Sequence, residues 1–79
     1  MSERNHADEL VEFAQRWQPY GGGEPAEILL EFGLTEREYF TRLREAIHAD
    51  PGMDPYARNA INLVATYRLE RLSTQGTIA

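Results

Sequence analysis

The chain has 79 residues, 42% of them hydrophobic, and it contains no cysteine. This length fits a single domain around one core, and the lack of cysteine excludes disulfides and thiolate metal sites. The net charge of −5 argues against nucleic acid and anionic membranes as partners. However, residues 1–32 carry seven acidic and two basic side chains, a balance of −5, so residues 33–79 balance to zero.

No unbroken apolar run exceeds three residues, far below the ~20 needed to span a bilayer. The first residues also lack the apolar stretch of a secretory signal. We therefore expect a cytoplasmic protein that makes no contact with a membrane.

The first predicted helix covers residues 6–17. Apolar residues recur at spacings of three and four along one face, and polar residues occupy the other face. Asn5 is the expected N-cap, and the glycines at 21–23 are expected to form a turn. We expect Trp17 and Tyr20 to close the core around this turn; a platform for stacking a ligand is the alternative.

The second predicted helix begins at Glu24 or Pro25 and ends at Phe32, and Gly33 is expected to adopt a left-handed conformation after it. The residues expected to point inward are Ile28, Leu29 and Phe32. The third helix begins after Thr35 and ends near Ala49. Thr35 and Glu38 have the spacing of a capping box, and the expected core face is Tyr39, Leu43, Ala46 and Ile47.

Residues 24–48 are expected to form a helix-turn-helix. A single glycine, the apolar Leu34 and a capped second helix follow the first helix, which is the composition typical of this motif. An ordinary hairpin of two helices is the alternative.

A fourth helix is predicted over residues 54–72, with Asp54 as its N-cap and Pro55 in its first turn. Its last turns are expected to leave the core, because Arg68 and Arg71 stand where the apolar side would continue. Residues 73–79 are expected to be a frayed tail. The whole chain, residues 1–79, is therefore expected to be one compact all-α domain of four helices.

The apolar residues of the fourth helix extend well beyond one face. Three of them form a line of their own: Tyr56, Leu63 and Tyr67. We expect this line to contact a second copy of the chain in a homodimer, or another protein. Burial of the whole helix at the centre of a monomer is the alternative.

About half of the chain resembles a known family. The similar segments are residues 13–22 (FAQRWQPYGG), residues 31–35 (EFGLT), and Tyr39 and Phe40 with Leu43. On these residues, the stretch from about Leu10 to Ile47 resembles a family of small actinobacterial helix-turn-helix proteins, classified as a domain of unknown function. The resemblance implies a helix-turn-helix fold and, by analogy, a DNA-binding regulator of transcription.

The outward side of the third helix carries the candidate DNA-binding residues. With about 100° per residue, one stripe without a carboxylate comprises Arg37, Thr41, Arg44 and His48. Phe40 is expected to border this stripe, half exposed. Arg42 is expected to be neutralised by Glu38 and Glu45, which lie four residues before it and three after it.

Each of these residue types suits double-stranded DNA. Arginine can fork onto a guanine edge or a phosphate, and Thr41 and Phe40 can contact a thymine methyl group. Thr35 and the free amides at the start of the helix can bind a phosphate. An ordinary solvated helix face is the alternative.

No catalytic or metal-binding arrangement is found in the sequence. His6 and His48 are far apart and have no partners at ligand spacing, and the glycines at 21–23 lack the Lys-Ser/Thr of a phosphate loop. The carboxylates of the first helix are expected on a solvated face, which does not tune a pKa for acid–base chemistry. We therefore expect neither an enzyme nor a metal or cofactor site.

Two functions follow from these observations. The first is a DNA-binding regulator that uses the third helix. The alternative is a protein-interaction module on the same scaffold, which would contact a partner through the acidic first helix or the apolar fourth helix.

Overall fold

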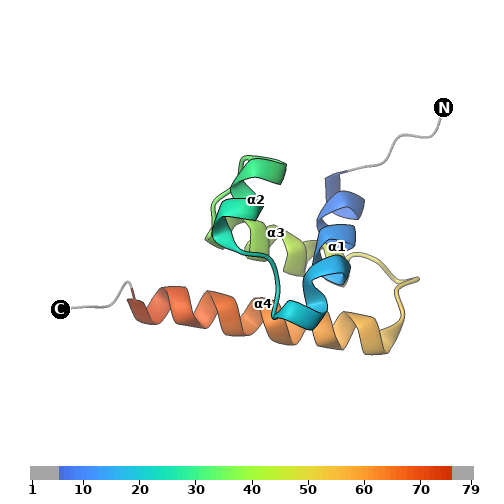
Figure 1. The fold of residues 1–79 in the computed structure, drawn as a ribbon. Coiled ribbons are helices and arrows are strands. Elements are labelled where there is room, and N and C mark those ends of the chain that lie inside the picture. Colours follow the sequence, from blue (N-terminus) through green and yellow to red (C-terminus); the bar gives the residue numbers. More distant parts are fainter. Residues whose placement is uncertain (1–5, 76–79) are drawn as a thin grey trace.

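The structure is a computed structural model, and it describes residues 6–75 of the chain. Its elements are α1 (His6–Trp17), the short 3-10 helix η1 (Gln18–Tyr20), α2 (Pro25–Phe32), α3 (Glu36–His48) and α4 (Pro55–Gln75). The predicted all-α fold of four α-helices is confirmed, and the first three helices have nearly the predicted bounds (Figure 1). No helix within residues 6–75 is long and apolar enough to cross a membrane.

Two of the predicted helix caps are formed. Thr35 Oγ1 accepts a hydrogen bond from the Glu38 amide at 3.1 Å, and the Thr35 amide donates to Glu38 Oε1 at 3.0 Å, which completes the capping box of α3. At the start of α4, Asp54 Oδ2 accepts from the Ala57 amide at 2.9 Å. These bonds satisfy amides that have no partner inside the helix. Asn5, the predicted cap of α1, lies outside the described residues.

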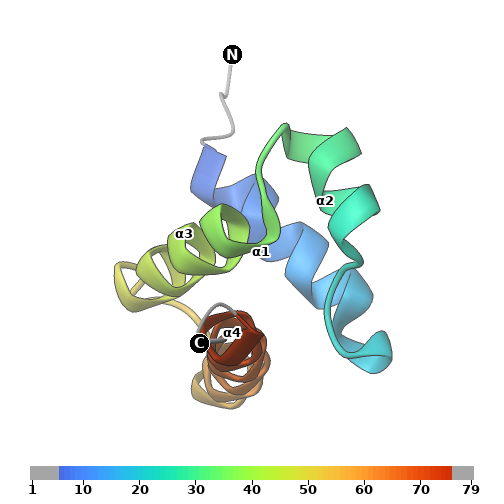
Figure 2. The ribbon, with the colours of Figure 1, turned by 90° about the vertical axis from the view of Figure 1, so that its left-hand side faces the viewer.

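α3 is the central element of the fold. It contacts α1, α2 and α4, whereas α4 packs against α3 and touches the η1 turn. Figure 2 looks almost along α4, which lies at the bottom of the view. α3 lies next to α4, and α2 lies at the upper right, away from α4. The segment from α1 to α3, which we call the head, therefore lies on one side of the long α4 (Figures 1 and 2).

The core of the head is built from aromatic side chains. Phe13 of α1, Phe32 of α2 and Tyr39 of α3 meet with ring centroids 5.3 to 5.5 Å apart. The buried Tyr39 hydroxyl donates to the Leu10 carbonyl oxygen at 2.9 Å. Burial raises the pKa of Tyr39, so the hydroxyl stays protonated and keeps this bond.

The glycine-rich turn before α2 is shaped by packing. Gly22 has a φ of +98°, and a side chain at this position would meet Val64 and Arg68 of α4. A Cβ at Gly23 would overlap the Phe13 ring. These two glycines therefore let α1 and α4 approach the turn closely, which gives the predicted turn a structural reason.

α4 is longer than predicted. Its 21 residues extend to Gln75 and span about 31 Å at 1.5 Å per residue. Its inner side buries Ile61 and Ala65 in the core. The expectation of a frayed tail from residue 73 is wrong for residues 73–75, which continue the helix; residues 76–79 lie outside the described part of the chain.

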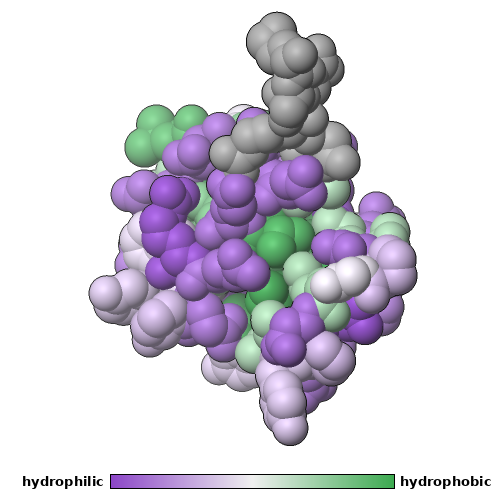
Figure 3. Space-filling model, turned by 90° about the vertical axis from the view of Figure 1, so that its right-hand side faces the viewer, coloured by the Kyte–Doolittle hydropathy of each residue, from purple (hydrophilic) through white to green (hydrophobic). Residues whose placement is uncertain are grey.

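Two residues expected in the core are exposed. Leu29 is 58% exposed, because α1 and α3 cover only one side of α2. Tyr20 touches Trp17 edge-on but is otherwise exposed, so Trp17 alone of this pair packs against the core. Figure 3 shows a separate hydrophobic area at its upper left, at the α2 end of the molecule. Leu30 of α2 is exposed as well.

Candidate nucleic-acid interface

The neighbouring helices leave one side of α3 open to solvent. The buried side chains of α3 are Tyr39, Phe40, Leu43 and Ile47. The exposed ones are Arg37, Glu38, Thr41, Arg42, Glu45 and His48. The predicted residues Arg37, Thr41 and His48 thus share the exposed side, with Thr35 at its beginning.

Two shallow grooves run along this side. The first, about 460 Å³, is lined by Arg37, Thr41 and Arg42 together with Glu38 and Glu45. The second, about 530 Å³, lies at the boundary with α4 and is lined by Thr41, Arg44, Glu45, His48, Ala49 and Leu69. Glu45 therefore borders both grooves, although no carboxylate was expected on the stripe itself.

Arg44 is only half exposed, because α4 lies alongside it. Its Nε atom is buried and has no hydrogen-bond partner among the described residues. An unpaired buried donor is costly, and this guanidinium, which lines the second groove, can donate a hydrogen bond to an oxygen of a ligand there.

The expectation that Phe40 borders the stripe is wrong. Its side chain is only 1% exposed and contacts the Tyr39 ring, with centroids 4.8 Å apart. The guanidinium of Arg68, from α4, covers its other face at 4.7 Å. Because α4 closes this side of α3, position 40 belongs to the core, and Phe40 cannot contact a thymine methyl group.

Arg42 also differs from the expectation. It is exposed, and within residues 6–75 no carboxylate lies within ion-pair distance of Arg42, nor of Arg37 or Arg44. The charge of Arg42 has only a minor effect on the pKa of Glu38. The pKa of Glu38 is lowered mainly by the hydrogen bond from the Thr35 amide, and the charge of Arg42 adds to this.

The carboxylates of α3 are less available than its arginines. Glu36 is bound by Arg68 of α4, and Glu38 is held in the capping box. Counting Arg37, Arg42 and Arg44 against Glu38 and Glu45 leaves +1 on this side of α3, within a chain of net charge −5. The side is therefore weakly basic, and the acidic excess belongs to the part of the chain before it.

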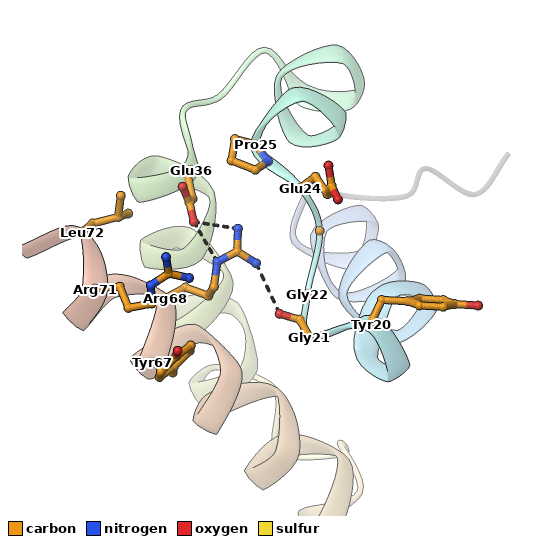
Figure 4. Close-up of a pocket in the computed structure, with 11 residues that line it drawn as sticks. Tyr20, Gly21, Gly22, Glu24, Pro25, Glu36, Tyr67, Arg68, Arg71 and Leu72 are labelled. Carbon is orange, nitrogen blue, oxygen red and sulfur yellow. Dashed lines mark hydrogen bonds and ion pairs between the residues drawn. The ribbon is translucent and has the colours of Figure 1, made fainter. Parts of the chain in front are cut away.

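The Arg68–Glu36 pair closes one end of a cleft of about 410 Å³ between α4 and the glycine turn (Figure 4). Arg68 Nε and Nη2 lie 2.7 and 2.6 Å from Glu36 Oε2, and Nη1 donates to the Gly21 carbonyl oxygen at 3.3 Å. This pair was not predictable from the sequence, because the two residues are 32 positions apart and no local pattern joins them. The expectation that the last turns of α4 leave the core is wrong at Arg68.

The predicted partner surface of α4 faces solvent. Tyr56, Leu63 and Tyr67 are 87%, 62% and 60% exposed. Burial of α4 on all sides of a monomer is therefore wrong, and the predicted line of three exposed residues stands free of the head.

No group of three or more histidine, cysteine, aspartate or glutamate side chains among residues 6–75 is arranged to hold a metal ion. Comparison of the chain with models of protein families, with curated proteins and with solved structures finds no match. The resemblance to the actinobacterial family therefore stays a prediction, and the site has to be argued from its own geometry.

Proposed function

We propose that this chain is a small DNA-binding regulator in which α2 and α3 act as a helix-turn-helix. One observation carries the proposal: Arg37 and Arg42 lie on the exposed side of α3, and no carboxylate of the described residues pairs with them. Unpaired arginines can fork onto a phosphate or onto the O6 and N7 atoms of guanine.

The remaining residues of α3 support the same ligand. Thr41 lies between the two grooves and can contact a thymine methyl group or a phosphate. The Thr35 hydroxyl already accepts from the Glu38 amide, which leaves its proton to be donated to a phosphate oxygen. Arg44, which is half exposed, and His48 both line the second groove and would contact the DNA backbone.

The acidic residues of α1 and α2 repel DNA, and the strength of this repulsion depends on their distance from it. Exposed carboxylates of α1 and α2, among them Glu9 and Glu27, oppose DNA over a Debye length of about 8 Å at physiological salt. We therefore expect weak, strongly salt-dependent binding. Helix-turn-helix proteins commonly compensate for one small interface by binding as two-fold dimers, and self-association of this chain through α4 would serve this purpose.

The test compares two exposed arginines. In a fluorescence anisotropy titration with a labelled duplex, we expect Arg37→Ala to weaken binding and to lower the salt slope by about 1. The control is Arg71→Ala, which removes an exposed arginine from α4 and should leave the affinity unchanged. Equal losses for both variants would indicate non-specific attraction and contradict a role of α3.

A protein-interaction module is the second candidate. The exposed apolar residues of α4 and the exposed Leu29 and Leu30 of α2 favour it, because large apolar side chains grouped on a surface typically mark contacts. Binding to such a partner should withstand Arg37→Ala and should be weakened by Leu63→Ala or, if α1 is the contact, by Glu12→Arg.

A further inference from the structure

The side of α4 that faces away from the head has an unusual composition. It carries an outward stripe of Tyr56, Asn59, Leu63, Tyr67 and Glu70, all exposed. With about 100° per residue these positions fall within about 80° of the helix circumference, opposite the buried Ile61 and Ala65. The outward stripe is thus a straight, narrow surface rather than a scatter of exposed residues.

The outward stripe is free of charge over most of its length. Between Pro55 and Tyr67 the one charged residue is Arg58, and its guanidinium turns back to donate to the carbonyl oxygens of Ile47 and Asp50. Arg68 likewise turns inward to Glu36. Charged residues make up 27% of the chain, and the solvated faces of helices usually carry them. Their absence here is typical of a helix side that packs against another surface.

The outward stripe is also symmetric about its centre. Leu63 is flanked by Asn59 and Tyr67 at a distance of four residues, and by Tyr56 and Glu70 at a distance of seven. A two-fold axis through Leu63 would therefore bring each polar residue opposite a different polar residue. Such reciprocal pairing, in which residue i contacts residue j and j contacts i, is the arrangement of an isologous interface.

We propose that α4 is the interface of a homodimer in which two copies pair antiparallel, with Leu63 on the two-fold axis. The Tyr56 hydroxyl of one copy then donates to the Glu70 carboxylate of the other, and Asn59 faces Tyr67. Glu70 also lies beside the first turn of the other α4, where the helix dipole favours a negative charge. A parallel pair would instead place Glu70 against Glu70.

A second copy fits the outward stripe better than a partner of opposite charge. The acidic excess of the chain lies in residues 1–32, whereas the stripe offers no charge from Tyr56 to Leu63. At Tyr67 the Arg71 guanidinium lies 5.8 Å from the ring centroid. A contact along one helix of about 31 Å covers less than the ~800 Å² per partner of standard interfaces, so the dimer should dissociate on dilution. The dimer does not depend on DNA binding and leaves the exposed side of α3 uncovered.

The first test is the molecular mass of the full chain in analytical ultracentrifugation. We expect the mass to rise with concentration from 9.1 kDa to twice this value. Leu63→Glu should raise the dissociation constant roughly a hundredfold or more, since both leucines leave the interface. Leu30→Glu is the matched control, because it places the same charge at an exposed leucine of α2 and should not change the constant. The circular dichroism spectrum of each variant verifies that it remains folded.

The second test fixes the direction of pairing by disulfide formation, which requires Cα atoms about 4.4–6.8 Å apart. The chain has no cysteine, so single cysteines report without interference. With diamide as oxidant, Leu63→Cys should cross-link to itself, and Tyr56→Cys should cross-link to Glu70→Cys but not to itself. A protein that stays monomeric at its highest soluble concentration, loss of the dimer in Leu30→Glu rather than Leu63→Glu, or self-linking of Tyr56→Cys would overturn the proposal.

Discussion

Arg68 joins three segments that are distant in sequence. Its guanidinium binds Glu36 at the start of α3, donates to Gly21 in the glycine turn and covers the Phe40 ring. The arginine and glutamate side chains are only 12% and 18% exposed, so solvent screens their attraction weakly. Arg68 therefore joins the second half of α4 to α3 and to the glycine turn.

Removal of Arg68 should be costly in stability. Arg68→Ala leaves Glu36 partly buried without its partner, and we expect a loss of about 2 kcal/mol, between the values of exposed and buried pairs. Chemical denaturation measures this loss. Arg71→Ala, which removes an exposed arginine three residues after Arg68 in the lining of the same cleft, should cost less than about 0.5 kcal/mol. In the double variant with Glu36→Gln the two losses should not add. Equal effects of the two arginine substitutions would contradict this role.

At the scale of the helices, the capping box of α3 links stability to pH. The bond from the Thr35 amide lowers the pKa of Glu38 below its ordinary value of 4.5. A carboxyl group whose pKa is lower in the folded state contributes stability above pH 4.5, and this contribution disappears as the pH falls through the lower value.

The variant Glu38→Gln should reveal this contribution. We expect its melting temperature to lie below that of the unaltered chain at pH 7, and the difference to shrink as the pH falls below 4.5. Thermal unfolding followed by circular dichroism measures both. Glu31→Gln on α2 is the control for removal of an exposed carboxylate. A difference that stays constant with pH would mean that the Glu38 charge does not stabilise the cap.

The elements themselves were largely predictable, because their signals are local. Thr35 and Glu38, and Asp54 before Pro55, mark where α3 and α4 begin within four residues of sequence. Burial was less predictable, because it depends on which neighbour covers each side of a helix. Phe40 is buried by α4, and Leu29 is exposed because none of the described helices covers its side of α2.

For the whole molecule, the distribution of charge matters more than its sum. The net charge of −5 comes from residues 1–32, and the ion pair of Arg68 removes Glu36 from the charges that α3 presents. The exposure of the candidate residues was predicted correctly at Arg37, Thr41 and His48 and incorrectly at Phe40. The state of Glu36 was not predictable, because it depends on a contact between the first turn of α3 and the far half of α4.

The most direct measurement is an NMR titration of the isotope-labelled chain with a short random-sequence duplex, at low and then at moderate salt. We predict amide shifts concentrated in Thr35 and α3 that diminish as salt is added, with α1 and the outward stripe of α4 unaffected. Non-specific binding by helix-turn-helix proteins has dissociation constants of roughly 10⁻⁴ to 10⁻⁶ M, so millimolar duplex saturates such a site. No shifts at that concentration, or shifts confined to α1 or α4, would contradict DNA binding by α3.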